Sequence, residues 1–403
     1  MSRRFQNPAT VALHGAGAAA RVSGSLAPSI VPSTTFLREG LDDAAEYAYS
    51  RVGNPTVSAL ESALGALEGG AEAAAFSSGL SAETTLLLAT LRAGDHIACG
   101  RAVYGGTVRL LRETFTGLGV EATFFDSTNA AALAAAVRPS TRVVLVETPA
   151  NPTLALTDIQ GAAPLAHAAG AILIVDNTFL TPALQRPLDL GADVVVYSTT
   201  KFIEGHSVAV GGAVTTRDGA LADRLRRVRK SVGTIQTPFN AWATLQGLRT
   251  LPLRIGQQSR HAARIASILA GDDRVGGVHY PGLRGFAQAD IARRQHLGAH
   301  GAVVSFEVPG GLAGARAAAR AVRLCSVVEH VGSVETLLTH PASMTHADVP
   351  REQREAAGVT DGLLRLSVGL EDPEDVLADL DLGIDAAAAA ARSEGRPPCL
   401  VNA

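Results

Sequence analysis

The 403-residue sequence contains very little lysine. Lysine and arginine together number 35, and of these only Lys201 and Lys230 are lysines. Cysteine is also scarce, with three residues at positions 99, 325 and 399. Widely separated cysteines in an odd number suit neither a disulfide framework nor a zinc site, and they are typical of a protein in a reducing cytosol.

The sequence also lacks long apolar runs and an excess of charge. No stretch approaches the roughly 18 apolar residues of a membrane span, and residues 1–8 contain no apolar segment of a signal peptide. A net charge of −3 offers no basic surface for nucleic acid. With 47% hydrophobic and 18% charged residues, the chain is predicted to be a soluble, cytoplasmic globular protein that binds neither membrane nor nucleic acid.

Three apolar runs follow one another at regular intervals in the middle of the chain. They are Val143–Val146, Ile172–Val175 and Val194–Val196, and helix-like segments such as Ile159–Ala169 separate them. Alternating strands and helices indicate parallel βαβ units, and continuous apolar runs indicate strands that are buried on both faces. The pattern predicts an α/β fold with a mostly parallel sheet between helices.

The regions on either side differ from this middle part. Residues 1–55 show no clear period and are predicted to form an arm. A large domain is expected over residues 56–255, followed by a smaller α+β domain over residues 256–403. Further helices are expected at 57–67, 80–91, 108–118, 220–229, 241–253, 259–269, 313–324 and 373–391, and further strands at 94–99, 121–125, 302–308 and 363–367.

The segment that follows the third apolar run, residues 197–201, ends in Lys201. Arginine does not lose its proton in proteins, whereas a desolvated lysine does, and a neutral amine forms a Schiff base with a carbonyl. Asp176 ends the preceding run, and open parallel sheets bind ligands at the carboxyl ends of their strands. A lysine that holds an aldehyde and a carboxylate that pairs with a ring nitrogen suit pyridoxal 5'-phosphate (PLP).

A phosphate group needs its own binding site. Ser77-Ser78-Gly79-Leu80 stands just before a predicted helix, where free backbone N–H groups and the helix dipole attract an anion. Ser198 and Thr200 are candidate donors, and Tyr104 is a candidate for stacking on the ring. Each feature has an ordinary alternative: a helix-capping Asp, a simple turn, a core aromatic or a surface lysine. Their order along one sheet favours the PLP interpretation.

The sequence resembles the Cys/Met-metabolism enzymes that use PLP, the group that contains cystathionine γ-synthase, cystathionine γ-lyase, methionine γ-lyase and O-acetylhomoserine sulfhydrylase. The resemblance implies the PLP-dependent transferase fold type I, with a smaller C-terminal α+β domain. The matching stretches, in family order, are 49–56, 77–82, 103–107, 147–153, 175–179, 198–201, 332–336, 340–346 and 365–371.

The resemblance also implies a role for each matching residue. Lys201, Tyr104 and Asp176 would be catalytic, with Lys201 as the Schiff-base lysine. The cofactor would be held by Tyr49, Arg51, Gly79, Leu80, Tyr104, Asp176, Ser198, Thr200 and Lys201. Tyr49 and Arg51 would come from the neighbouring subunit, so a homo-oligomer, a dimer of dimers, is expected. Arg365 and Asn151 would bind the α-carboxylate of an amino-acid substrate, and no metal is expected.

Several positions depart from the family pattern. His330 stands where the family commonly has a serine, and Gly106 stands where methionine γ-lyases typically have a cysteine. Val31 and Val52 replace aromatic residues of the arm. Glu329 matches a glutamate that faces the distal ammonium of a long substrate in cystathionine-handling members. These features favour a γ-synthase or γ-lyase, with His330 and Glu329 in the substrate pocket.

The function predicted first is therefore a transsulfuration-type γ-elimination or γ-replacement on a homoserine-derived amino acid, similar to cystathionine γ-lyase or γ-synthase. Three alternatives stay open. They are an enzyme like O-acetylhomoserine sulfhydrylase or one with a specialised γ-substitution, an aminotransferase on the same fold, and a cofactor-binding protein without activity. The sequence does not distinguish the leaving group or elimination from replacement.

Overall fold

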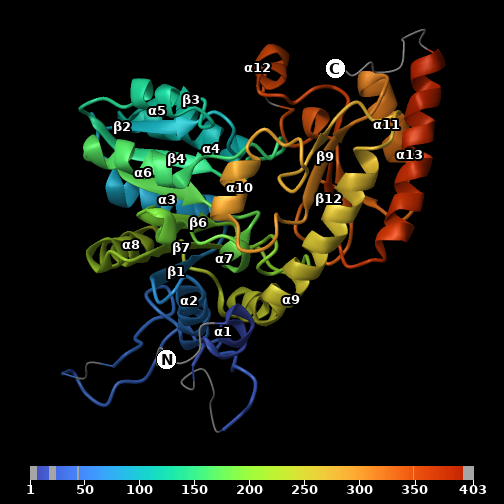
Figure 1. Ribbon diagram of the computed structural model, residues 1–403. Coiled ribbons are helices and arrows are strands. Elements are labelled where there is room, and N and C mark those ends of the chain that lie inside the picture. The colour runs from blue at the N-terminus through green and yellow to red at the C-terminus, as the bar shows by residue number, and fades with distance from the viewer. Residues whose placement is uncertain (1–6, 18–23, 43–44, 348, 394–403) are drawn as a thin grey trace.

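The computed structural model describes residues 7–17, 24–42, 45–347 and 349–393 (Figure 1). Cys399 and residues 1–6 lie outside this part of the chain. The α-helices are α1 Pro8–His14, α2 Pro55–Leu67, α3 Gly79–Thr90, α4 Gly105–Arg109, α5 Ala130–Ala136, α6 Ile159–Ala168, α7 Thr181–Leu184, α8 Gly219–Val232, α9 Pro238–Leu269, α10 Ala289–Gln295, α11 Gly311–Ala321, α12 Arg351–Ala356 and α13 Pro373–Ser393. The strands are β1 Glu72–Phe76, β2 His96–Gly100, β3 Glu121–Phe125, β4 Thr141–Glu147, β5 Ile172–Asp176, β6 Val194–Tyr197, β7 Gly212–Thr216, β8 Val278–His279, β9 Val303–Glu307, β10 Ser326–Val327, β11 Leu337–Thr339 and β12 Leu363–Ser367.

A seven-stranded sheet forms the larger half of the molecule, in the order β1-β7-β6-β5-β4-β2-β3. The pairs between β3, β2, β4, β5 and β6 are parallel, and β7 runs antiparallel to both β6 and β1. Helices α3 and α8 pack on one face, and α5 and α6 pack on the other (Figure 1). The apolar runs in β4, β5 and β6 are buried because helices cover both faces of the sheet. The expected mixed, mostly parallel sheet between helices is confirmed.

The C-terminal part contains a second sheet of five strands, in the order β10-β11-β12-β9-β8. All pairs except β10 with β11 are antiparallel. Helices α11 and α13 contact each other and pack against this sheet around Phe306, Leu364 and Leu380, which are buried (Figure 1). The expected smaller α+β domain is confirmed.

Helix α9 connects the two halves as one continuous helix of 32 residues. The prediction of two separate helices at 241–253 and 259–269 is wrong. Pro252 lies inside α9, although proline removes a backbone hydrogen bond and crowds the preceding turn. The Arg254 guanidinium donates to the Gly247 carbonyl at 2.7 Å and helps to hold this turn. Since residues 255 and 256 lie inside α9, the three-part division of the chain stays a proposal.

Two local differences from the sequence predictions remain. Residues 8–14 of the expected arm form helix α1, which packs against α2 and α9. The segment near 108–118 is helical, but it changes type, from α4 to a π-helix over Leu110–Phe115 and a 3₁₀ turn over Thr116–Leu118. Within the described residues, no helix is both long and apolar enough to cross a bilayer.

Candidate active site

The site lies where three neighbouring strands end. Strands β4, β5 and β6 are parallel and end at Glu147, Asp176 and Tyr197, and Glu147 pairs directly with Asp176 in the sheet register. Lys201 follows in the turn after β6. Because parallel strands present their carboxyl ends at the same edge, residues from distant parts of the sequence meet here.

A pocket of about 810 Å³ opens at this edge, between the two halves of the molecule. Most of the residues predicted from the sequence line it together. They are Gly79, Leu80, Tyr104, Asn151, Asp176, Ser198, Thr200, Lys201, Glu329, His330 and Arg365. Tyr49 and Arg51 do not line it, and no group of three His, Cys, Asp or Glu side chains in the described part of the chain could hold a metal ion.

The large-domain wall of the pocket is acidic. Burial raises the pKa of Glu83 to about 8, and repulsion from Asp176 adds to this effect. The same two causes hold the pKa of Glu147 well above its usual range. Burial also raises the pKa of Asp176, although the Thr178 amide donates to its carboxylate at 2.8 Å. A cation bound between these carboxyl groups would relieve this repulsion, which fits a protonated ring nitrogen at Asp176.

The opposite wall is basic and carries Arg365, which is 2% exposed. Its guanidinium donates to the Asn151 Oδ1 at 2.8 Å, the His330 carbonyl at 3.0 Å and the Thr339 hydroxyl at 3.1 Å. None of these acceptors is a carboxylate, and the buried Nε of Arg365 has no partner among the described residues. Burial lowers the pKa of Arg365 to about 10, while the charge of Glu147 acts in the other direction. Such a site fits a substrate carboxylate.

Lys201 lies between the two walls, with its Nζ 3.2 Å from the Nδ1 of His330. Burial, and then the positive charge of Arg365, lowers the pKa of Lys201 to about 8. Burial is the main cause that lowers the pKa of His330 to about 4, and the positive charges of Lys201 and Arg365 act in the same direction. His330 is therefore neutral at physiological pH. A lysine with this pKa is present in both protonation states near neutral pH, as acid–base chemistry requires.

The first turn of α3 has the features of an anion-binding site. Ser78 caps the helix by accepting a hydrogen bond from the Ser81 amide at 3.0 Å, which leaves the first-turn N–H groups of Gly79 and Leu80 for a ligand. A Cβ on Gly79 would lie 2.9 Å from the Cβ of Ser198, so only glycine allows this approach. The Thr200 hydroxyl already donates to the Gly211 carbonyl at 3.0 Å. Of the two predicted hydroxyl donors, the one on Thr200 is thus already engaged with the protein backbone.

Tyr104 is the N-cap residue of α4, lines the pocket and is 42% exposed. Its backbone amide donates to Glu147 at 2.7 Å, which ties the turn to the end of β4. A Cβ on Gly106 would lie 2.4 Å from the Tyr104 ring. Any larger residue at position 106, such as cysteine, would therefore displace the ring from its present place.

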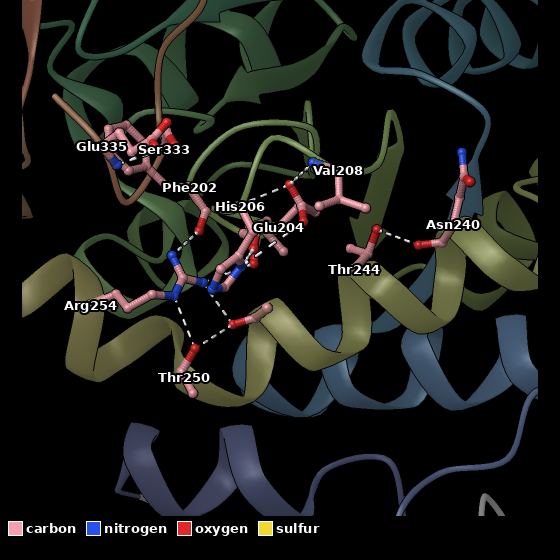
Figure 2. Close-up of polar contacts among 12 residues, drawn as sticks. Phe202, Glu204, His206, Val208, Asn240, Thr244, Thr250, Arg254, Ser333 and Glu335 are labelled. Carbon is pink, nitrogen blue, oxygen red and sulfur yellow. Dashed lines mark hydrogen bonds and ion pairs between the residues drawn. The ribbon is translucent and has the colours of Figure 1, made fainter. Parts of the chain in front are cut away.

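The loop that follows Lys201 is held by a buried arginine (Figure 2). Arg254 from α9 donates to the carbonyls of Phe202 at 3.0 Å and Ile203 at 3.2 Å. The buried carboxylate of Glu204 accepts from the amides of His206 at 3.0 Å and Val208 at 3.2 Å (Figure 2). These contacts fix the backbone on the C-terminal side of Lys201.

Tyr49 and Arg51 lie away from the pocket of their own chain. Arg51 donates to the Lys230 carbonyl at 2.7 Å, and its guanidinium lies 5.3 Å from the centre of the Tyr49 ring. Tyr49 is 42% exposed. In a single chain, therefore, these residues do not take part in the site.

Sequence reasoning missed several residues that shape the site. Glu147 ends β4 just as Asp176 ends β5, and this common position was the signal that could have found it. Glu83 is the single charged residue of α3, which is unusual in a helix that is otherwise apolar or small, and its carboxylate accepts from the Thr107 hydroxyl at 2.9 Å. Arg254 and Gly332 act on the backbone around Lys201. Gly332 begins the matching stretch 332–336, whereas no local pattern marks Arg254.

An acidic wall, a basic wall and a helix N-terminus suited to an anion thus surround one lysine, and their arrangement fits PLP. The family model for the Cys/Met metabolism PLP-dependent enzymes matches residues 9–385. The chain belongs to this family. Its members depend on PLP, so the chain is a PLP-dependent enzyme, and the expectation of a cofactor-binding protein without activity is set aside.

Relatives and solved structures agree on this family. The chain is 40% identical to an L-methionine γ-lyase of Fusobacterium nucleatum subsp. polymorphum over 387 residues, which cover 93% of this chain and 97% of the relative. It is 42% identical to a cystathionine γ-synthase of Mycobacterium bovis over 378 residues, covering 94% and 96%. The crystal structure of cystathionine γ-synthase from Xanthomonas oryzae pv. oryzae, in complex with aminoacrylate and cysteine, matches with a TM-score of 0.92 and 43% identity, covering 95% and 99%. The predicted family, fold type and cofactor are confirmed.

Proposed function

We propose that this PLP enzyme acts at the γ-carbon of a homoserine-derived L-amino acid, by γ-elimination or γ-replacement. The observation that carries the proposal is the buried guanidinium of Arg365, which has no carboxylate partner among the described residues and shares one pocket with Lys201. An α-amino acid supplies the missing carboxylate. The activities of two relatives with similar identity, a γ-lyase and a γ-synthase, support chemistry at the γ-carbon.

The cofactor would be held by residues of the large domain. Lys201 would bind its aldehyde, Asp176 its ring nitrogen, Tyr104 its ring face, and Gly79, Leu80, Ser198 and Thr200 its phosphate, with Tyr49 and Arg51 of a second copy completing the phosphate site. When bound, PLP supplies an electron sink for the bond that breaks at the α-carbon of the substrate. This assignment matches the acidic wall at Asp176 and the free N–H groups of α3.

The protein's own residues would orient the substrate and move its protons. Arg365, oriented by Asn151, would bind the α-carboxylate in a bidentate manner. The Lys201 amine, with a pKa of about 8, would take the α-proton and return it elsewhere on the substrate. The Tyr104 hydroxyl at the mouth would protonate the departing γ-substituent.

The outer pocket favours a substrate with a charged distal group. Glu329 is exposed and lines the pocket, as do Arg101 and Arg112. A carboxylate and guanidinium groups together suit a distal amino acid, which carries both charges, better than the methyl thioether of methionine. We therefore propose cystathionine, or an acylated homoserine with cysteine, as the substrate class, with His330 forming part of the pocket.

One experiment separates the candidate reactions. Purified protein is incubated with cystathionine, with O-succinyl- or O-acetylhomoserine plus cysteine or sulfide, and with methionine, and the products are identified by mass. Conversion of cystathionine to cysteine, 2-oxobutyrate and ammonia would support γ-elimination, whereas homocysteine, pyruvate and ammonia would show β-elimination and contradict the proposal. Formation of cystathionine would support γ-replacement. Preferential use of sulfide would favour a sulfhydrylase. Turnover of none of these compounds would contradict the proposal.

The aminotransferase alternative makes a different prediction for the same assay. A transaminase converts an added 2-oxo acid into an amino acid, whereas elimination and replacement leave that acceptor unchanged. Isotope-labelled 2-oxoglutarate in the reaction therefore decides between them. Recovery of labelled glutamate in proportion to substrate loss would overturn the γ-carbon proposal.

We also propose that the active unit is at least a dimer, assembled as a dimer of dimers. Tyr49 and Arg51 lie outside the pocket of their own chain, although the family pattern assigns them to a phosphate site. Beside the loop after Lys201, Val208, Val210 and Phe239 are 75%, 52% and 61% exposed. Burial of these side chains against a second copy would contribute stability.

Mixing two inactive variants tests this assembly. Arg51→Ala and Lys201→Ala are each expected to lose activity. In a mixed dimer, the chain that keeps Lys201 receives an intact Arg51 from its partner, so random reassociation restores about a quarter of the sites. Absence of recovery, with mixed dimers demonstrated by mass, would show that Arg51 does not act across subunits.

A further inference from the structure

We propose that His330 is a positioning residue that accepts a hydrogen bond from the free Lys201 ammonium and keeps the proton on that amine. The Nδ1 of His330 lies 3.2 Å from the Lys201 Nζ, on the wall of the pocket. A lysine ammonium has three donors and no acceptor, so Nδ1 must be the acceptor whenever Lys201 is charged. The catalytic meaning of the contact rests on the proposed role of Lys201, but the contact itself does not.

The backbone on both sides of the His330 side chain is held in place, which keeps its Cα next to Lys201. The His330 carbonyl accepts from Arg365 at 3.0 Å, and the amide of Gly332 donates to the Ser367 hydroxyl at 2.8 Å. Gly332 has a φ of +92°, and a Cβ there would lie 2.5 Å from the Phe202 amide nitrogen. The loop between β10 and β11 is therefore pressed against the backbone of Lys201 itself.

The charges around the pair leave His330 as the acceptor. Arg365 faces both side chains, Glu147 acts on Arg365, and Glu329 precedes His330 in the chain. Burial and the two neighbouring cations keep the imidazole neutral, since they lower its pKa to about 4. Its Nε2 is buried and has no partner within the described chain, so Nδ1 makes the hydrogen bond of the ring. A neutral imidazole holds one proton, which is then on Nε2.

The hydrogen bond to His330 is expected to favour the protonated form of Lys201. Burial and Arg365 drive the proton off this amine, whereas a hydrogen bond to the charged form favours its retention. His330 thus opposes the loss of the proton and holds the ammonium in one place. An amine that has collected a proton from the substrate keeps it until it is returned, instead of releasing it to water.

The scarcity of lysine makes a direct test practical. Only Lys201 and Lys230 have side-chain amines, and Lys230 is exposed, so it serves as an internal reference. The full-length protein is freed of PLP with hydroxylamine and treated briefly with acetic anhydride between pH 5 and 10. Acetylation of each lysine peptide is then measured by mass spectrometry. In the wild type, Lys201 is expected to titrate near its pKa of about 8.

The deciding variant is His330→Phe, which keeps a ring but removes the acceptor. The Lys201 titration is expected to shift to lower pH by about one unit, so that at pH 6.5 its labelling relative to Lys230 rises roughly tenfold. His330→Asn places an amide oxygen near the position of Nδ1 and is expected to restore most of the wild-type curve. His261→Phe on α9, which does not line the pocket, is the matched control and is expected to change nothing.

The result that would overturn the proposal is equally specific. An unchanged Lys201 titration in His330→Phe, or a shift to higher pH, would show that His330 does not stabilise the ammonium. If this variant does not fold, as judged by circular dichroism, His330→Leu provides the same comparison. The measurement needs neither PLP nor substrate. A failure of the proposed γ-carbon chemistry would therefore appear in the product assay and leave the labelling result intact.

Discussion

The two walls of the active site differ in charge and in origin. The wall from the large domain is acidic, with Glu83 buried on α3, Glu147 buried at the end of β4 and Asp176 half-buried at the end of β5. The wall from the C-terminal part is basic, with Arg365 buried on β12. In the proposed assignment, PLP and an amino-acid substrate would need both walls, because the protonated ring nitrogen would face the acidic wall and the substrate carboxylate the basic wall. Each wall is therefore electrostatically unfavourable until its own ligand is bound.

Lys201 lies between the walls, and its removal gives the largest expected effect. Lys201→Ala is expected to lower turnover at least about 10³-fold, because proton transfer and the attachment point for the aldehyde are both lost. The visible absorbance of bound PLP should change with it. Lys201→Arg keeps the charge but cannot lose its proton, so it is expected to be equally inactive. Substantial turnover in either variant would show that Lys201 is not the catalytic lysine.

The second largest effect on activity is expected from substitution of Arg365 on the basic wall. Arg365→Leu is expected to lower kcat/KM about 10- to 100-fold, mostly through a higher KM, because charge-assisted hydrogen bonds to the α-carboxylate are lost. PLP absorbance should remain, since the acidic wall is intact. Arg365→Lys tests whether the planar, bidentate guanidinium is required. Loss of bound PLP together with an unchanged KM would show that Arg365 binds the cofactor and not the substrate.

The junction between the walls depends on Gly332. In Gly332→Ala the new Cβ would lie 2.5 Å from the Phe202 nitrogen, at a φ of +92°. The strained backbone alone costs about 1–3 kcal/mol, and displacement of the Lys201 segment adds to it. We expect a clear loss of thermal stability together with lower activity. Gly285→Ala is the matched control, because nothing lies within 4 Å of its Cβ. Equal stability of the two variants would contradict the close packing.

The smallest effect is expected from the acidic wall, in the pH dependence of stability. The pKa of Glu83 rises from 4.5 to about 8 in the folded protein, so its stabilising contribution is complete below pH 4.5 and is lost as the pH rises towards 8. Glu83→Gln cannot ionise. In the protein without PLP it is expected to melt a few degrees above the wild type at pH 9, with little difference at pH 5.

The control for this prediction is Glu352→Gln on α12, where the side chain is exposed. It is expected to shift the melting temperature equally at both pH values. A Glu83→Gln variant whose difference from the wild type is the same at pH 5 and pH 9 would show that Glu83 is ionised throughout. Differential scanning fluorimetry at the two pH values is sufficient.

The two walls were also unequally predictable. Asp176 and Lys201 follow apolar runs of the sequence, and the strand pattern alone places both at one edge of the sheet. Glu147 and Glu83 were missed although both carry a local signal. On the basic wall, Arg365 and His330 were found through the family resemblance, since nothing in the local pattern of β12 or the 330 loop distinguishes them. Arg365 and His330 lie close to Lys201 only because the C-terminal part packs against the large sheet.

The continuous helix α9 could not be predicted from local sequence rules either. Two helices, at 241–253 and 259–269, were predicted, and Pro252, which cannot donate a backbone hydrogen bond, lies inside the single helix that forms. The helix continues through this turn, where Arg254 donates to the Gly247 carbonyl, and the same guanidinium holds the loop after Lys201. A side chain that serves two segments cannot be inferred from either segment alone.

The sequence alone was enough to predict the layered α/β fold, the family and the cofactor, because these follow from periodicity, residues at strand ends and the matching motifs. It also marked Lys201, which the structure places in the pocket. The folded chain was needed for the contact of His330 with Lys201 and for the continuous α9. The physical reason is distance along the chain. Burial and charge act through space, so the pKa of Lys201 depends on Arg365, 164 residues away in sequence (365 − 201), and no local pattern records that proximity.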